Sequence, residues 1–154
     1  MLYFLSGLTC SEDNAAQKSG FAEYAKKHGV AVVFPDTSPR KLGFAEVNDN
    51  ENWKVGYGAG HYCDATQEPW SNNFNMYTYV TSELPNIVNS YFPVDPATKS
   101  IMGHSMGGLG ALTVGLRNTS DYASVSAFAP IGNPETSGFC TDAMSQYLGK
   151  EQAS

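Results

Sequence analysis

Long apolar runs, excess basic charge and paired cysteines are all scarce in this sequence. No window approaches the ~18 uninterrupted apolar residues of a membrane-spanning helix, so no membrane association is predicted. Nine Lys and Arg against 15 Asp and Glu give a formal net charge of −6, which leaves no basic surface for nucleic acid. The cysteines are odd in number and widely spaced, at Cys10, Cys63 and Cys140. This pattern indicates reduced thiols rather than a disulfide framework or a zinc site.

The composition is that of one domain. Hydrophobic residues make up 42% of the chain and charged residues 16%, enough for one core and too few charges for a disordered chain. We find no internal repeat, low-complexity tract or linker, so residues 1–154 are taken as a single domain. The opening MLYFLSGLTC has no basic segment before its apolar run and is not a secretory signal. Together with the cysteine pattern, this predicts a cytoplasmic protein.

Short apolar runs bounded by turn residues predict strands, and longer periodic segments predict helices between them. The expected strands are residues 2–5, 30–34, 99–104 and 124–129. The expected helices run from the capping residues 11–14 to 28, then over 75–92 and 106–117. This alternation predicts an α/β fold with a mainly parallel sheet of about four strands and flanking helices. Residues 35–70 break the periodicity and are expected to form a long functional loop.

The decapeptide IMGHSMGGLG, residues 101–110, contains the Gly-x-Ser-x-Gly pattern of a nucleophile elbow. Ser105 falls between a predicted strand and a helix that begins at Met106, where an elbow presents its serine at the carboxyl edge of a sheet. Gly103 and Gly107 lack Cβ atoms and let strand and helix approach closely. The helix N-terminus favours negative charge, so Ser105 is predicted as nucleophile and the Met106 N–H as an oxyanion-hole donor.

A second oxyanion donor is expected in the turn after the first strand, whose sequence is SGLTC. Gly7 opens the backbone there, and the N–H of Leu8 is the predicted partner of the Met106 N–H. Gly7 and Cys10 are predicted to contact substrate, with a small buried filler as the alternative role of Cys10. Trp70 in the long loop is also predicted to line the substrate pocket. Further candidates from the same loop are Trp53, Tyr57 and Tyr62. For all four aromatic residues, the alternative is that they pack the loop against the core.

Seven segments spread over nearly the whole chain are characteristic when taken together: LSGLTC (5–10), PDTSPR (35–40), GYGAGHYCDAT (56–66), MYTYVTSELP (76–85), FPVDP (92–96), GHSMGG (103–108) and SVSAFAPIGNP (124–134). In sequence and in order they resemble the S-formylglutathione hydrolase family of α/β-hydrolases, also called esterase D. The resemblance implies a serine thioesterase that hydrolyses S-formylglutathione to formate and glutathione, a step of formaldehyde detoxification. It implies no cofactor, and a homodimer is compatible with it. The departures are His61 and Cys63, where the family tends to carry apolar residues.

A base for Ser105 is missing from the second part of the chain. An α/β-hydrolase carries its triad in the order Ser, Asp or Glu, His, yet no histidine follows Ser105. His104 is its neighbour but is expected to face the other side of the strand. His61 in the long loop stays open as an alternative base. The later Asp121 and Asp142 do not follow the strand after which the triad acid belongs, so both triad partners are absent.

The simplest interpretation is that the chain is an internal part of a longer domain. The N-terminal strands and the C-terminal part with the triad Asp and His are then the missing pieces. The family's sheet order places the four strands as second, first, third, fourth, with 30–34 and 124–129 as uncovered apolar edges. Because a serine hydroxyl without a base is a weak nucleophile, the chain as given is predicted to have little or no esterase activity.

Two alternatives stay open. One is a general short-chain carboxylesterase on the same scaffold. The other is a non-catalytic remnant that binds a partner through its exposed sheet edges, favoured by the missing histidine and disfavoured by the complete elbow. The acidic residues Asp13, Asp64 and Glu68 show no metal-ligand spacing, so no metal site is predicted.

Overall fold

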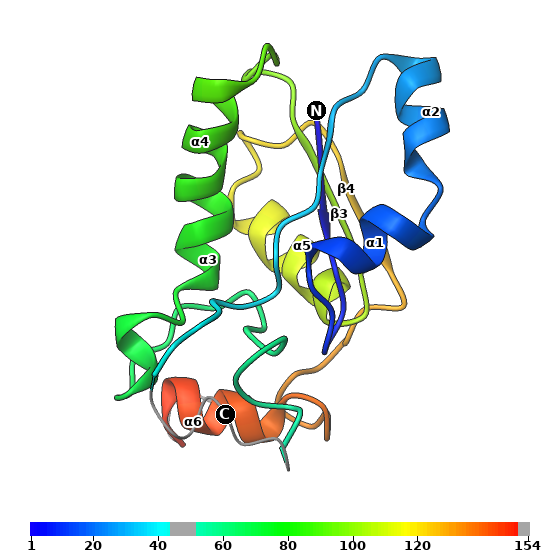
Figure 1. The fold of residues 1–154 in the computed structure, drawn as a ribbon. Coiled ribbons are helices and arrows are strands. Elements are labelled where there is room, and N and C mark those ends of the chain that lie inside the picture. Colours follow the sequence, from blue (N-terminus) through cyan, green and yellow to red (C-terminus); the bar gives the residue numbers. More distant parts are fainter. Residues whose placement is uncertain (44–51, 151–154) are drawn as a thin grey trace.

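The computed structural model describes residues 1–43 and 52–150 and contains a parallel sheet between helices (Figure 1). The strands are β1 (Leu2–Leu5), β2 (Val32–Val33), β3 (Ser100–His104) and β4 (Val125–Phe128). They lie in the order β2-β1-β3-β4, and every neighbouring pair is parallel. The predicted α/β class, the parallel sheet and the strand order are confirmed.

The register of the two central strands brings their carboxyl ends to the same level. β1 pairs with β3 from Leu2 opposite Ser100 to Leu5 opposite Gly103. The turn after β1 and the residue after β3 therefore emerge side by side, at the edge where open α/β sheets bind ligands. β2 is shorter than the predicted 30–34, because the Val30 N–H donates to the carbonyl of Ala25 (2.9 Å) and so closes the preceding helix.

The single helix predicted up to residue 28 is wrong, because two helices occupy this region. They are α1 (Glu12–Lys18) and α2 (Phe21–His28). Gly20 separates them with a φ of 68°, a left-handed conformation that an α-helix cannot contain. Ser11 and Asn14 form a capping box at the start of α1, and left-handed Gly29 ends α2 as predicted.

The helix predicted over 75–92 is a continuous helical segment with a local π-turn. It consists of α3 (Met76–Thr78), the π-helical η3 (Tyr79–Glu83) and α4 (Leu84–Tyr91). Pro85 lies in the first turn of α4, where its missing N–H costs no hydrogen bond within α4. The wider π-turn directly precedes it, as expected next to a residue that cannot donate to the turn before.

Helices cover both faces of the sheet. Figure 1 shows α5 (Met106–Arg117) and the α3–α4 segment on one face, with α1 and α2 on the other. The main core lies between β1, β3 and α5, where Tyr3, Leu5, Ile101 and Val114 are almost completely buried. This packing anchors the strand ends that carry the candidate site.

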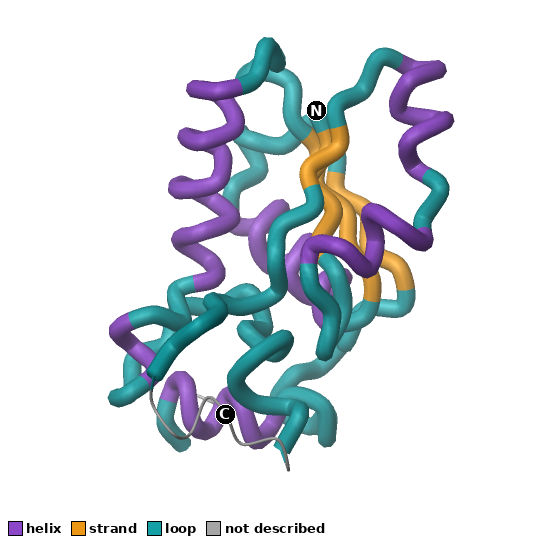
Figure 2. The backbone as a smooth tube through the Cα atoms, viewed as in Figure 1, coloured by secondary structure: helices purple, strands orange, loops and turns teal. Residues whose placement is uncertain are grey.

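A second, smaller cluster lies beyond the carboxyl ends of the strands, in a layer that is mostly loop (Figure 2). It joins the loop after residue 52, the short η2 (Trp70–Asn72) and α6 (Thr141–Leu148). The Tyr147 hydroxyl accepts the N–H of Gly56 (2.8 Å) and donates to the carbonyl of Ala59 (2.9 Å). Within residues 1–43 and 52–150, no helix has both the length and the apolarity to cross a bilayer.

Candidate active site

Ser105 occupies a sharp turn between β3 and α5. Its φ of 57° and ψ of −117° lie in a region that costs a non-glycine residue roughly 1–3 kcal/mol. The backbone is fixed on both sides, because the Ser105 N–H donates to the Phe128 carbonyl (3.0 Å) and its own carbonyl accepts the Leu109 N–H (3.1 Å). The side chain is partly exposed, and its hydroxyl forms no hydrogen bond within the described residues. This is the geometry expected of a nucleophile elbow.

Two glycines make this turn sterically possible. A Cβ at Gly107 would lie 1.9 Å from the carbonyl oxygen of Leu5, far inside van der Waals contact. A Cβ at Gly103 would lie 2.0 Å from the carbonyl oxygen of Gly107. The helix therefore starts directly against the end of β1, and this contact holds Ser105 next to the turn that follows β1.

The turn SGLTC lies beside Ser105, as the sequence predicted. A Cβ placed on Gly7 would lie 3.5 Å from the Cβ of Ser105. Among the hydrogen bonds of the described residues, none uses the backbone N–H of Leu8 or of Met106. Both donors are therefore available to a ligand, and the Met106 N–H also carries the partial positive charge of the α5 N-terminus.

A pocket of about 210 Å³ contains Ser105. Its lining residues come from four separate segments and are Gly7, Leu8, Cys10, Trp53, His104, Ser105, Ile131 and Phe139. Trp53 and Phe139 form an aromatic wall with ring centroids 6.3 Å apart. Ile131 and Phe139 were not predicted as pocket residues. Ile131 lies in the family-like segment 124–134 but carries no reactive group, and Phe139 lies in the irregular chain that follows it.

The predicted substrate contacts divide into two groups. Gly7 and Cys10 line the Ser105 pocket, whereas Trp70 does not. Trp70 is only 2% exposed and packs its ring 4.8 Å from that of Phe74 and 4.9 Å from that of Tyr147. Trp70 therefore packs the loop against the core, which was the alternative to a substrate contact. The tryptophan that lines the Ser105 pocket is Trp53.

Neither nearby histidine is hydrogen-bonded to Ser105 in the described part of the chain. His104 is exposed and lines the pocket from the neighbouring position. His61 is 3% exposed, with Nε2 3.3 Å from the Lys54 carbonyl and Nδ1 3.5 Å from the Cys140 Sγ. Burial lowers the pKa of His61 to about 4, so it is neutral at physiological pH and lies outside the Ser105 pocket.

The three cysteines are free thiols. Burial raises the pKa of Cys63 to about 12 and that of Cys140 to about 11, so neither forms a thiolate at neutral pH. Cys10 is the one that borders Ser105. Over residues 1–43 and 52–150, no three His, Cys, Asp or Glu side chains come together as a metal site.

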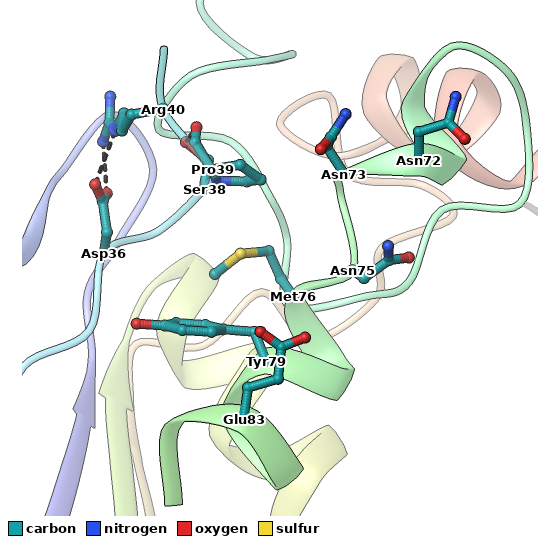
Figure 3. A pocket seen from close by; sticks show the side chains of 10 residues that line it. All are labelled: Asp36, Ser38, Pro39, Arg40, Asn72, Asn73, Asn75, Met76, Tyr79 and Glu83. Carbon is teal, nitrogen blue, oxygen red and sulfur yellow. Dashed lines mark hydrogen bonds and ion pairs between the residues drawn. The ribbon is translucent and has the colours of Figure 1, made fainter. Parts of the chain in front are cut away.

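Figure 3 shows the lining of a larger hollow of about 440 Å³. This hollow shares no lining residue with the Ser105 pocket. One wall is the segment after β2, with the Asp36–Arg40 ion pair, and another is the α3–η3 segment, with Met76, Tyr79 and Glu83. The greater size of this hollow does not make it the reactive site, because Ser105 and Leu8 both line the smaller pocket.

Comparisons with known proteins identify the family of the chain. The Esterase family profile matches residues 1–152. S-formylglutathione hydrolase of Mus musculus is 51% identical over 99% of this chain, and that of Paracoccus denitrificans is 48% identical over 99%. The solved S-formylglutathione hydrolase of Agrobacterium tumefaciens is 45% identical over 99% of the chain, with a TM-score of 0.94. The resemblance inferred from the sequence motifs is confirmed.

The chain spans about half the length of these relatives. It covers 53% of the mouse protein, and 54% of the solved Agrobacterium chain. The similarity therefore extends over almost all of this sequence and over only part of each relative.

Proposed function

The chain belongs to the Esterase family, and on this premise we propose that it carries the nucleophile and the oxyanion donors of an S-formylglutathione hydrolase. The observation that supports this most directly is the conformation of Ser105. It adopts positive φ at a strand–helix turn, beside two backbone N–H groups that have no partner among the described residues, in a chain 51% identical to the mouse enzyme.

The proposed reaction is a two-step acyl transfer. The Oγ of Ser105 attacks the thioester carbonyl, and the oxyanion that forms accepts hydrogen bonds from the N–H groups of Leu8 and Met106. The C–S bond then breaks, glutathione leaves as the thiol, and a formyl ester remains on Ser105. Water hydrolyses that ester to formate and restores the hydroxyl.

The proton of the Ser105 hydroxyl needs an acceptor in the first step, and glutathione needs a proton as it leaves. No histidine follows Ser105 in this sequence, and the two considered above make no hydrogen bond to it in the described residues. We therefore place the acid and base in the part of the relatives that this chain does not match. The nucleophile and the proton acceptor of the proposed reaction then lie in different portions of the domain.

The test is the rate of S-formylglutathione hydrolysis by the purified chain and by its Ser105→Ala variant. In serine hydrolases, removal of triad members lowers turnover by around a millionfold. Because this chain has no base for Ser105, both rates should be near background. A Ser105-dependent rate close to that of the mouse enzyme would show that this chain supplies its own base, and the division proposed here would be wrong.

A general carboxylesterase is the second candidate, supported by the small apolar pocket with Trp53 and Phe139. Relative rates with S-formylglutathione and short-chain p-nitrophenyl esters separate the two, once the relative's unmatched portion is joined to this chain. A binding remnant is the third. It predicts that a fluorophosphonate leaves Ser105 unmodified even in the joined protein.

Formaldehyde detoxification is proposed as the process, because S-formylglutathione is the thioester that results when the formaldehyde–glutathione adduct is oxidised by two electrons in a separate, preceding step. A cytoplasmic location is proposed with it, and the three free thiols support a reducing compartment. A homodimer remains a prediction from the family, checked by the mass of the joined protein in solution.

A further inference from the structure

We propose that the Asp36–Arg40 pair is a positioning device for the Leu8 amide. This inference rests on the proposed role of Leu8 as an oxyanion donor. An oxyanion donor acts only when its N–H is held in place before charge develops, within about 0.5 Å of the productive position. What holds the turn after β1 is therefore part of the site, although it does not touch the substrate.

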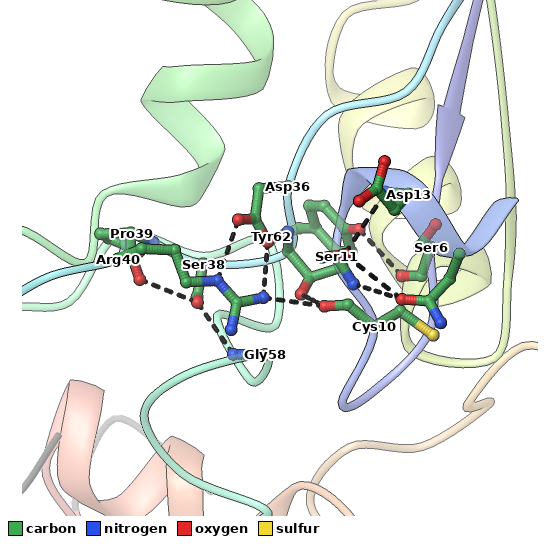
Figure 4. A network of polar contacts seen from close by, with 12 residues as sticks. Ser6, Cys10, Ser11, Asp13, Asp36, Ser38, Pro39, Arg40, Gly58 and Tyr62 are labelled. Atoms are coloured by element: carbon green, nitrogen blue, oxygen red, sulfur yellow. Dashed lines mark hydrogen bonds and ion pairs between the residues drawn. The ribbon is translucent and has the colours of Figure 1, made fainter. Parts of the chain in front are cut away.

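One end of this turn is held through the carbonyl of Cys10 (Figure 4). The Nη2 of Arg40 donates to the Cys10 oxygen at 3.0 Å, and the hydroxyl of Thr37 donates to the same oxygen. Both donors come from the segment after β2, about thirty residues further along the chain, so they tie the turn to a separate part of the fold.

Asp36 fixes the direction of the Arg40 side chain. Its carboxylate accepts the Arg40 Nε–H at 2.9 Å and the Nη2–H at 2.7 Å, which is a bidentate pair. The same Nη2 therefore bridges Asp36 and the Cys10 carbonyl. Only the planar guanidinium presents donors in this fork, so a lysine at position 40 keeps the charge and loses the geometry.

The rest of the turn is held in the same way. The hydroxyl of buried Tyr62 donates to the Ser6 carbonyl at 2.8 Å, and the Thr9 N–H donates to the Gly58 carbonyl at 2.8 Å. The carbonyls at both ends and the N–H of Thr9 are thus occupied, while the Leu8 N–H stays unpaired within the described residues. The network therefore holds the turn at both ends and keeps the Leu8 N–H available to a ligand.

The test uses the chain itself and needs no turnover. Formate, the proposed product, is titrated into ¹⁵N-labelled protein, and the limiting shifts of the Leu8 and Met106 amides are recorded. Met106 is the internal reference, because its N–H belongs to α5 and not to the turn. In the wild type we expect both amides to shift.

Two variants change the positioning pair. In Arg40→Lys and in Asp36→Asn, the ratio of the Leu8 shift to the Met106 shift should fall by about twofold or more, since a hydrogen bond weakens steeply off its axis. Loss of the Asp36 charge alone would remove a Coulomb repulsion and so strengthen the binding of formate. A lower Leu8-to-Met106 shift ratio in Asp36→Asn therefore cannot come from weaker anion binding through charge. Arg117→Lys, at the far end of α5, is the matched control and should keep the wild-type ratio.

The outcomes separate this inference from the proposed function. If both amides shift in the wild type and the ratio stays the same in both variants, the positioning role is refuted while the oxyanion assignment stands. If both shifts fall equally, the pair acts only through general stability and the inference is also refuted. If neither amide moves in the wild type, the oxyanion assignment itself is refuted and the inference falls with it.

Discussion

At the scale of single residues, the elbow was predictable because its chemistry is local. Ser105, Gly103 and Gly107 lie within five positions, and each residue type follows from the conformation that the turn requires. Phe139 in the Ser105 pocket and the contact between His61 and Cys140 were not predictable. They join segments far apart in the chain, and nothing in either local sequence indicates its partner.

Gly107→Ala tests the steric account of the elbow. Its Cβ would lie 1.9 Å from the Leu5 carbonyl oxygen, so β1 and α5 must move apart. We expect a loss of about 3 kcal/mol or more in the free energy of unfolding, measured by urea denaturation. Gly138→Ala is the matched control, since a Cβ there meets no atom within 4 Å. Equal stability of the two variants would refute the close contact.

His61 gives the chain a predicted pH dependence. Its folded pKa of about 4 lies below the ordinary value of 6.5, so the unfolded state takes up the proton first as the pH falls. The His61 contribution to stability is therefore complete above pH 6.5 and declines towards pH 4, by about 2 kcal/mol between pH 7 and pH 5.

His61→Phe should remove this part of the pH dependence. Unfolding free energies at pH 7 and pH 5 measure it in both proteins, and the variant should lose less stability on acidification. His28→Gln, at an exposed position, is the control and should behave as the wild type. A variant that loses as much as the wild type would show that His61 is not buried in neutral form.

At the scale of elements, hydrophobic pattern predicted which segments form strands and helices, and backbone details set their ends. The strand Leu2–Leu5 and the helix Met106–Arg117 match the prediction. The region before residue 28 was mispredicted, because Ser19-Gly20 was not recognised as a helix break. The docking of α6 was also beyond prediction, since it depends on Tyr147 reaching a loop some ninety residues earlier.

Tyr147→Phe tests how α6 is attached. The hydroxyl of this buried side chain bonds both the Gly56 N–H and the Ala59 carbonyl, and its loss leaves two buried backbone groups without this partner. We expect a loss of about 1–3 kcal/mol in unfolding free energy. Tyr24→Phe is the control, because Tyr24 is 61% exposed and should change stability very little. A neutral Tyr147→Phe would mean that packing alone holds α6.

At the scale of the whole molecule, the sheet order was predicted from family resemblance together with the alternation of strands and helices. The chain covers 53% of its mouse relative and has no histidine after Ser105. In the function proposed above, this chain presents the nucleophile and the oxyanion donors, and the portion of the relatives that it does not match supplies the proton acceptor. The strand β4 lies at one edge of the sheet, and the side chain of its Phe128 is 53% exposed there.

The most direct measurement is the hydrolysis of S-formylglutathione by this chain joined to the unmatched remainder of the mouse enzyme, in that enzyme's own order. The account predicts that the joined protein turns over, and that Ser105→Ala reduces its rate by around a millionfold. Hydrolysis that survives the loss of the Ser105 hydroxyl would contradict the assignment of the nucleophile, and with it the function proposed for this chain.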